Sequence, residues 1–159
     1  MKSWKRKGIK SIWKANNDTD KQIMNTDDTD NTEIRRNSLI YEDLTYKING
    51  VIFNVHTELG PYAREKQYVD LAFTRLKEKG LIVEKEKPIG DSGNILDLIV
   101  EHKVILEFKA KRILTKEDYY QTQRYLQHTG LRLALLVNFR TKYVRPKRIV
   151  KIDNWKDKK

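Results

Sequence analysis

The stretch Asn94-Ile-Leu-Asp-Leu-Ile-Val-Glu-His-Lys-Val-Ile-Leu-Glu-Phe-Lys-Ala110 decides the fold of this chain. It contains two short apolar runs, Ile95–Val100 and Val104–Phe108, with three polar residues between them. Runs this short and rich in Ile, Val and Leu are typical of strands buried on both faces, and the polar break predicts a tight hairpin. Three charged residues nevertheless lie in or directly after these strands: Asp97, Glu107 and Lys109. Burying a charge without a partner costs several kcal/mol or forces neutralisation, so each of the three should have a partner.

The register of this hairpin would bring the three charges together. If the polar trio forms the loop, Val100 faces Val104 and Asp97 falls opposite Glu107, with Lys109 on the same face. Two like charges facing each other across a hairpin destabilise it, so a positive group is expected between them. A divalent cation fits, because carboxylates are the ligands that Mg²⁺ and Mn²⁺ prefer. An internal cluster of ion pairs with the lysine is the alternative, and a two-residue turn would make the two carboxylates diagonal.

The length and composition restrict the class of protein. At 159 residues the chain has the length of one domain and can bury a sizeable core. It has no cysteine, which excludes disulfides and thiolate zinc sites. No apolar run approaches the roughly 20 residues that a membrane helix needs, and no secretory signal is present. We therefore expect a cytoplasmic protein that has no membrane partner.

The formal charge of +11 is concentrated at the two ends of the chain. Residues 1–15 carry six lysines and arginines without an acid, and residues 142–159 carry eight against two aspartates, so residues 16–141 net −1. Basic ends attract polyanions and speed encounters with nucleic acid without conferring sequence specificity. A solubilising surface is the alternative explanation.

Three regions of the chain differ in composition. The first begins with basic residues and tryptophans and continues with Asn, Asp and Thr, so it has too few apolar side chains to offset the entropy of ordering. We predict a disordered extension over 1–37, a folded domain over 38–150 and a basic tail over 151–159.

Apolar periodicity predicts the elements of the folded domain. Apolar residues at helical spacing indicate three helices, each followed by a glycine that can end it. Short runs of β-branched residues bounded by turn residues indicate the strands. The order helix, strand, strand, strand, helix, strand predicts an α/β fold with a central mixed four-stranded sheet flanked by helices. The helices are expected over 42–59, 64–79 and 116–128, and the strands over 81–88, 95–100, 104–108 and 131–137, with 148–150 as an optional edge strand.

Four short patterns lie along this order of elements. Asp97, nine further residues and then Glu107-Phe108-Lys109 match D-x(n)-E-x-K. The segment Glu58-Leu-Gly-Pro-Tyr-Ala-Arg-Glu-Lys-Gln-Tyr68 matches GxxExxY, except that a tyrosine, Tyr62, stands where a glycine opens the motif. Gln121 and Tyr125 lie four residues apart on a helix, and Asn138-Phe139 follows the last buried strand.

These patterns together resemble the GxxExxY proteins, a family of small proteins similar to the PD-(D/E)XK nucleases. The resemblance covers roughly residues 40–150, and it includes the QxxxY helix and the LLxNF ending found in such proteins. It implies a restriction-endonuclease-like αβββαβ core, which is also the order that the periodicity predicts.

The resemblance also implies a metal site. Asp97 and Glu107 would hold Mg²⁺ or Mn²⁺ as the cofactor. Glu65, through a water molecule, and the backbone carbonyl of Phe108 would be further ligands. The metal would polarise a phosphate and lower the pKa of an attacking water.

The expected activity is metal-dependent hydrolysis of phosphodiester bonds in DNA or RNA, which makes the protein a nuclease and a hydrolase. Lys109 would orient the attacking water or stabilise the charge that develops on the phosphate. Gln121 and Tyr125 would position a phosphate or the lysine itself. Together with Glu65, Asp97 and Glu107 they form the expected catalytic set.

Two other functions are compatible with the same fold, because a fold does not fix a function. One is a catalytically weak or silent module that binds nucleic acid, and the other is a protein-interaction module. The expected partner is nucleic acid, DNA ahead of RNA, and a homodimer remains open. His56, His102 and His128 have no second histidine or cysteine at ligand spacing, so we expect no metal site there.

Overall fold

The computed structural model describes residues 39–156. The predicted extension, residues 1–37, lies outside the described residues, as do residue 38 and residues 157–159. Among the described residues, those from 46 onward form one compact unit, and every strand described belongs to it. No helix within residues 39–156 combines the length and the apolar character that a membrane crossing requires.

Within residues 39–156, three helices and five strands follow one another in the predicted order, which confirms the α/β fold class. The sheet has five strands, one more than the predicted four, because the optional segment near residue 148 does form an edge strand. The strands lie in the order β1-β2-β3-β4-β5, with β3 and β4 parallel and every other pair antiparallel. The elements are α2 Glu42–Leu59, α3 Glu65–Glu78, β1 Val83–Ile89, β2 Asn94–Val100, β3 Val104–Lys109, α4 Lys116–Thr129, β4 Leu133–Asn138 and β5 Lys147–Val150.

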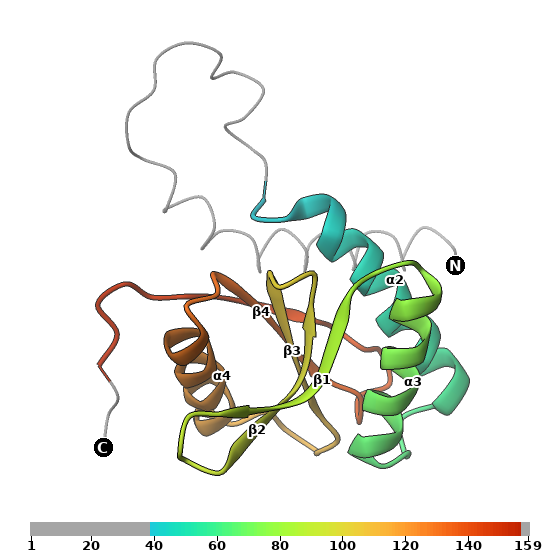
Figure 1. Cartoon of the computed structure of the whole chain (residues 1–159). Coiled ribbons are helices and arrows are strands. Elements are labelled where there is room, and N and C mark those ends of the chain that lie inside the picture. The colour runs from blue at the N-terminus through green and yellow to red at the C-terminus, as the bar shows by residue number, and fades with distance from the viewer. Residues whose placement is uncertain (1–38, 157–159) are drawn as a thin grey trace. The chain divides into compact units, whose positions relative to one another are not determined.

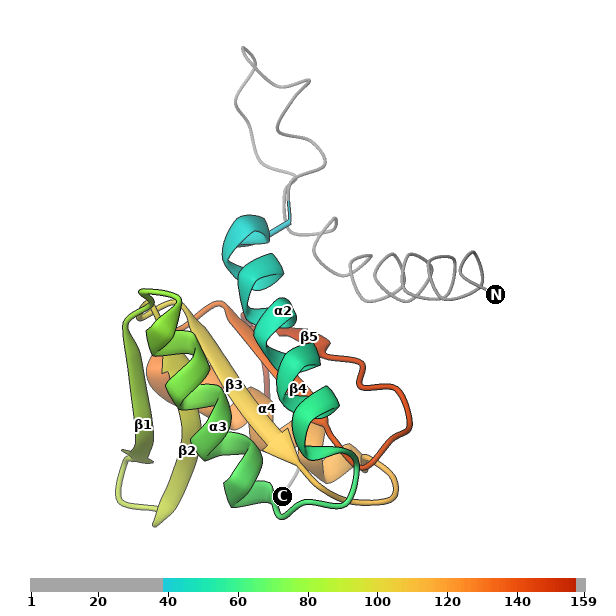
Figure 2. The same cartoon turned by 90° about the vertical axis from the view of Figure 1, so that its right-hand side faces the viewer.

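The sheet lies between two layers of helices (Figures 1 and 2). α2 and α3 cover one face, and α4 covers the other. The buried residues of α3 recur at i, i+4 and i, i+8, as Tyr68, Ala72 and Leu76 show, and this apolar stripe turns toward the sheet. β3 and β4 are covered on both sides, which explains why their sequences are almost continuously apolar.

The β2–β3 hairpin has the predicted three-residue loop. Val100 pairs with Val104, and the amide of Lys103 donates to the Val100 carbonyl at 3.0 Å. Two of the loop residues, Glu101 and His102, take left-handed φ angles of 53° and 52°, which bring the chain around. The paired ladder ends at Leu98 and Leu106, one residue before the two strand carboxylates.

The charged residues of the hairpin therefore lie at the end of the sheet where β3 and β4 finish. The last residues of these two parallel strands, Lys109 and Asn138, are paired neighbours. Figures 1 and 2 show that α3 and α4 both begin at this same end. Helix N-termini carry partial positive charge and unpaired N–H groups, so this end of the sheet suits acidic groups and phosphates.

Candidate active site

Lys109 is the centre of a polar cluster formed by β3 and α4. Its Nζ donates to Oε1 of Glu107 at 2.8 Å and to Oε1 of Gln121 at 3.0 Å. The side chains of the lysine and the glutamate are only 14% and 4% exposed. Residues two apart on β3 point to the same side, and this side faces α4, so the strand and the helix jointly hold the ammonium group in place.

Asp97 reaches the cluster from β2. Beyond the end of the ladder, the backbone N–H of Phe108 donates to Oδ2 of this aspartate at 2.7 Å. The Asp97 carboxylate therefore accepts a hydrogen bond from the backbone of the residue that lies between Glu107 and Lys109 in β3. This contact fixes the aspartate beside the glutamate and the lysine without a direct ion pair between Asp97 and Lys109 among the described residues.

Burial raises the pKa of both carboxyl groups of the site. Burial raises the pKa of Asp97 to about 6, opposed by the Phe108 N–H and assisted by the charge of Glu65. Burial and then the Asp97 charge raise the pKa of Glu107 to about 8, although Lys109 lowers it. Within residues 39–156 the second oxygen of Glu107, Oε2, is buried and has no hydrogen-bond partner. With both carboxyl groups ionised, the site would carry more negative charge than its one lysine neutralises.

Lys109 and Tyr125 respond to the same charges. Burial lowers the pKa of Lys109, but Glu107, Glu65 and Asp97 outweigh it and raise the pKa above the ordinary value, so this lysine stays charged. Burial and then the Glu107 charge raise the pKa of Tyr125 to about 12. The tyrosine ring packs in the apolar core between α4 and the sheet, while its hydroxyl group faces the field of the carboxylates.

Glu65 approaches the cluster from α3, on the opposite side of the sheet from α4. It is the first residue of that helix and is exposed. Its charge acts on Asp97, Glu107 and Lys109, raising the pKa of each. The structure thus brings the four charged residues expected at the site into one electrostatic unit.

Tyr68 has a structural contact that the sequence did not reveal. Its hydroxyl group donates to the Gly60 carbonyl at 2.5 Å and accepts the N–H of Ala63 at 3.0 Å. Its ring is fully buried and lies flat against Phe139, with centroids 4.2 Å apart. The tyrosine of GxxExxY therefore stabilises the loop that leads into α3, and Glu65 is the first residue of the helix after this loop.

The tyrosine that replaces the first glycine of the motif fits this loop without strain. Gly60 takes the left-handed φ of 69°, and Tyr62 does not have a positive φ. The Tyr62 side chain is 82% exposed, with the Arg140 guanidinium 5.6 Å from its ring centroid. The left-handed position of the loop is thus occupied by a glycine two residues earlier.

Asn138 supports the site in a way that sequence reasoning missed. Its side chain accepts the N–H of Lys111 at 3.2 Å and donates to the Lys111 carbonyl at 2.7 Å. The amide of Phe139 donates to the Lys109 carbonyl at 2.9 Å. The Asn-Phe pair after β4 therefore fixes the chain directly after Lys109. The LLxNF pattern points to this pair, but only the long-range contacts give it a role.

The donors present suit a divalent metal in part. Asp97 and Glu107 offer carboxylate oxygens, and the unpartnered Oε2 of Glu107 is an acceptor that a cation would satisfy. Among residues 39–156 no group of three or more His, Cys, Asp or Glu side chains lies close enough to hold a metal. Any metal here would therefore depend on two carboxylates, a backbone carbonyl and water, a set that Mg²⁺ accepts because it usually keeps several waters.

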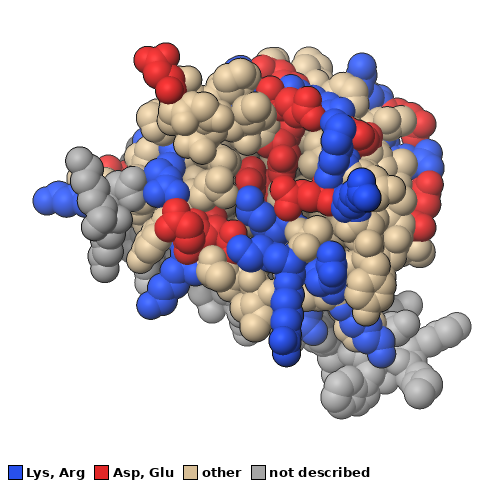
Figure 3. All heavy atoms as spheres, turned by 90° about the horizontal axis from the view of Figure 1, so that it is seen from below, with Lys and Arg blue, Asp and Glu red and all other residues tan. Residues whose placement is uncertain are grey.

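The surface around this end of the sheet is strongly charged (Figure 3). A band of acidic side chains runs down the middle of the face, and Lys and Arg side chains gather directly beside it. A concentration of acids suits a cation, and a neighbouring concentration of bases suits a polyanion, so the two together suit a metal and a phosphate backbone.

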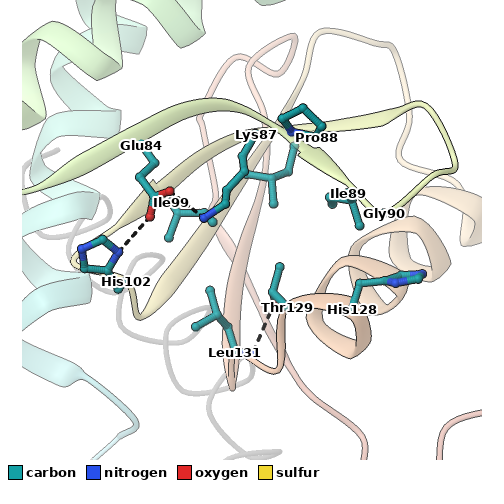
Figure 4. Close-up of a pocket in the computed structure, with 11 residues that line it drawn as sticks. Glu84, Lys87, Pro88, Ile89, Gly90, Ile99, His102, His128, Thr129 and Leu131 are labelled. Carbon is teal, nitrogen blue, oxygen red and sulfur yellow. Dashed lines mark hydrogen bonds and ion pairs between the residues drawn. The ribbon is translucent and has the colours of Figure 1, made fainter.

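A separate pocket of about 360 Å³ lies between β1, β2 and the C-terminal end of α4 (Figure 4). Its main charged groups already pair with one another, since Glu84 binds Lys87 at 2.6 Å and His102 at 2.8 Å. Figure 4 shows Glu84 between these two partners, and His128 lies across the pocket at the end of α4. Among the described residues that line this pocket, no carboxylate pair compares with that of Asp97 and Glu107.

Comparison with known proteins identifies the family of this chain. No curated protein and no solved structure matches the chain. The family model of the PD-(D/E)XK nuclease superfamily matches residues 42–151, which run from the first residue of α2 to the residue after β5. Because this match takes in every helix and strand described, together with the D-x(n)-E-x-K residues, the chain belongs to the PD-(D/E)XK nuclease superfamily.

Proposed function

We propose that this protein is a metal-dependent nuclease of the GxxExxY type, which hydrolyses phosphodiester bonds in DNA ahead of RNA. The observation that carries the proposal is the pairing of Lys109 with a buried carboxylate whose second oxygen has no partner within residues 39–156. A purely structural ion pair gains nothing from such an unsatisfied acceptor, because an unpaired buried oxygen costs about 1–3 kcal/mol.

Asp97, Glu107 and the carbonyl of Phe108 are the groups that would hold Mg²⁺ or Mn²⁺, with Glu65 acting through water. Such an ion, when bound, polarises a phosphate oxygen and lowers the pKa of a coordinated water. Ionised carboxylates are needed to bind it, so binding must displace the protons that Asp97 and Glu107 hold with raised pKa values of about 6 and about 8.

Lys109 supplies the positive charge of the protein itself. Its ammonium group is held by Glu107 and Gln121 and stays charged at neutral pH, so it can donate to a phosphate oxygen and stabilise the charge that develops there. Gln121 fixes the direction of the ammonium group. Tyr125, with its pKa raised to about 12, stays protonated, and its hydroxyl group can donate a hydrogen bond toward the same site.

Cleavage of labelled single-stranded, duplex and branched DNA and RNA, with Mg²⁺ or Mn²⁺ and with EDTA, tests this proposal. We expect cleavage that requires the metal, and a loss of at least about a hundredfold in Asp97→Ala and in Lys109→Met. The first variant removes a proposed metal ligand, and the second removes the ammonium group that would stabilise the developing charge.

Asp91→Ala is a matched control, because Asp91 is an exposed turn residue between β1 and β2. Its cleavage rate should equal that of the wild type. Equal cleavage by Asp97→Ala and by the wild type would exclude the proposed site. Retention of nucleic acid without any cleavage would support the silent binding module instead.

A further inference from the structure

We propose that the groove between the start of α4 and the segment that joins β4 to β5 binds a single-stranded stretch of nucleic acid beside the site. The role of this groove in presenting a substrate rests on the proposed nuclease function, but binding of the single strand does not require cleavage. It specifies the substrate as a chain with unpaired bases at the point of entry.

The groove has a volume of about 470 Å³ and two walls. One wall is formed by the β3–α4 connection and the first turns of α4, and the other by the chain that follows β4. Figure 2 shows these two connections next to each other, and both line the same pocket. The lining includes four cations and two tyrosines: Arg112, Tyr119, Lys142, Tyr143, Arg145 and Lys147.

The cations of the groove are available to an anion. None of the four forms an ion pair with an acid in the part of the chain that the structure describes. The sequence from residue 139 to residue 152 contains no Asp or Glu. Arg112, Lys142 and Arg145 are exposed, so a phosphate can reach them. Unpaired lysines and arginines along one groove attract a phosphate backbone.

The tyrosines decide between a single strand and a duplex. The Tyr143 ring is 53% exposed, with the Lys142 ammonium 5.4 Å from its centroid, and Tyr119 on the opposite wall is partly exposed. An exposed ring beside a lysine offers a platform for a base, and a base can stack on it only when it is not paired in a duplex. The combination of free cations with two rings therefore favours an unpaired strand.

The groove lies directly beside the candidate active site. Asn138 lines it and pairs with Lys109 in the parallel ladder between β3 and β4, where strands lie about 5 Å apart. Asn138 also holds the backbone of Lys111, the residue before Arg112. A strand lying in the groove thus leads toward the ammonium group of Lys109 one strand away.

The test is the binding of a fluorescently labelled 20-nucleotide single strand, and of the same sequence as a duplex, to the full chain in EDTA. We expect tighter binding of the single strand. The triple variant R112A/K142A/R145A should bind it at least about tenfold more weakly, because phosphate contacts dominate such affinities. Tyr143→Ala should lose about fivefold or more for the single strand only, whereas Tyr143→Phe should keep wild-type binding, since a phenyl ring still stacks.

The control K47A/K77A/K79A removes the same charge from exposed lysines of α2 and of the C-terminal end of α3. An equal loss in both triple variants would overturn the proposal, because the basic ends of the chain would then account for the affinity. An equal loss for duplex and single strand in Tyr143→Ala would also overturn it. Measuring binding in EDTA separates this proposal from the proposed nuclease function. Binding in the groove can be absent although the protein cleaves in the presence of metal, and a protein that does not cleave can still bind the strand in the groove.

Discussion

The folded protein buries Glu107 in an environment that disfavours the ionised form of its carboxyl group. The residue is 3% exposed, and one of its oxygens has no partner within residues 39–156. Burial and then Asp97 raise its pKa to about 8, so the folded protein binds this proton more tightly than the unfolded chain, whose glutamate titrates near 4.5. The stabilisation by this proton is fully present below about pH 4.5 and is lost as the pH rises through about 8. Without a metal, the charged form therefore weakens the fold in alkaline solution.

The substitution Glu107→Gln tests this at the scale of the residue. In EDTA at pH 9 we expect the variant to have a free energy of unfolding roughly 2 kcal/mol above that of the wild type, because glutamine copies the protonated acid. At pH 5 the two proteins should differ much less. Urea unfolding at both pH values measures the difference.

Glu117→Gln is the control, since this helix glutamate is exposed and forms its ion pair with Arg124 at the surface. It should shift stability by the same small amount at both pH values. A Glu107→Gln variant that is less stable than the wild type by an equal amount at pH 5 and pH 9 would contradict the assigned pKa.

At the scale of the element, two loops position the residues of the candidate site: the loop between α2 and α3, and the chain that follows β3. The connection between α2 and α3 is closed by the Tyr68 hydroxyl group, and the chain after β3 is closed by Asn138. The rings of Tyr68 and Phe139 stack within the core, so one aromatic contact joins the two connections. The same aromatic contact therefore helps to position Glu65 at the start of α3 and Lys109 at the end of β3.

Tyr68→Phe removes only the hydroxyl group that closes the first connection. We expect a loss of about 1–2 kcal/mol in the free energy of unfolding, because the Gly60 carbonyl and the Ala63 N–H lose their partner while the ring stays in place. Cleavage should fall as well, since Glu65 begins at the end of this loop. Chemical unfolding and the cleavage assay measure the two effects.

Tyr46→Phe provides the comparison, because that tyrosine is 77% exposed on α2. It should leave both stability and cleavage unchanged. Unchanged stability in Tyr68→Phe would show that water replaces the hydroxyl group in the loop without cost.

At the scale of the whole molecule, the charge of the site links stability to metal binding. Asp97 and Glu107 lower the stability of the folded chain when both are ionised, since burial raises the pKa of both groups. A cation that binds these carboxylates in the folded state alone stabilises the protein by mass action. The melting temperature of the whole protein therefore reports whether a metal binds to these two carboxylates.

Adding Mg²⁺ or Mn²⁺ at pH 8 should raise the melting temperature of the wild type. A concentration one hundred times the dissociation constant corresponds to about 2.7 kcal/mol. The double variant D97N/E107Q should show no such shift, because it offers neither carboxylate, and it should already melt above the metal-free wild type. Differential scanning calorimetry with and without EDTA measures both. An equal metal-induced shift in the double variant would place the metal elsewhere.

The sequence determined the elements and their order. The helix over 42–59 has the predicted bounds, and the hairpin loop and its register follow the polar trio between two apolar runs. These features depend on local periodicity and on residues a few positions apart, so a single chain contains the information. Asp97, Glu107 and Lys109 could be grouped in advance for the same reason, since one hairpin connects them.

Only the tertiary structure decided which distant residues meet this hairpin and how. No local sequence pattern encodes three of these features. They are the hydrogen bond of Tyr68 to Gly60, the hydrogen bond of Asn138 to Lys111, and the groove that Arg112 and Arg145 both line. The fifth strand was an option in the sequence, because its four residues become a strand only when β4 offers an edge to pair with. Backbone periodicity is a property of neighbours in the chain, whereas the charge and shape of a site are set by neighbours in space.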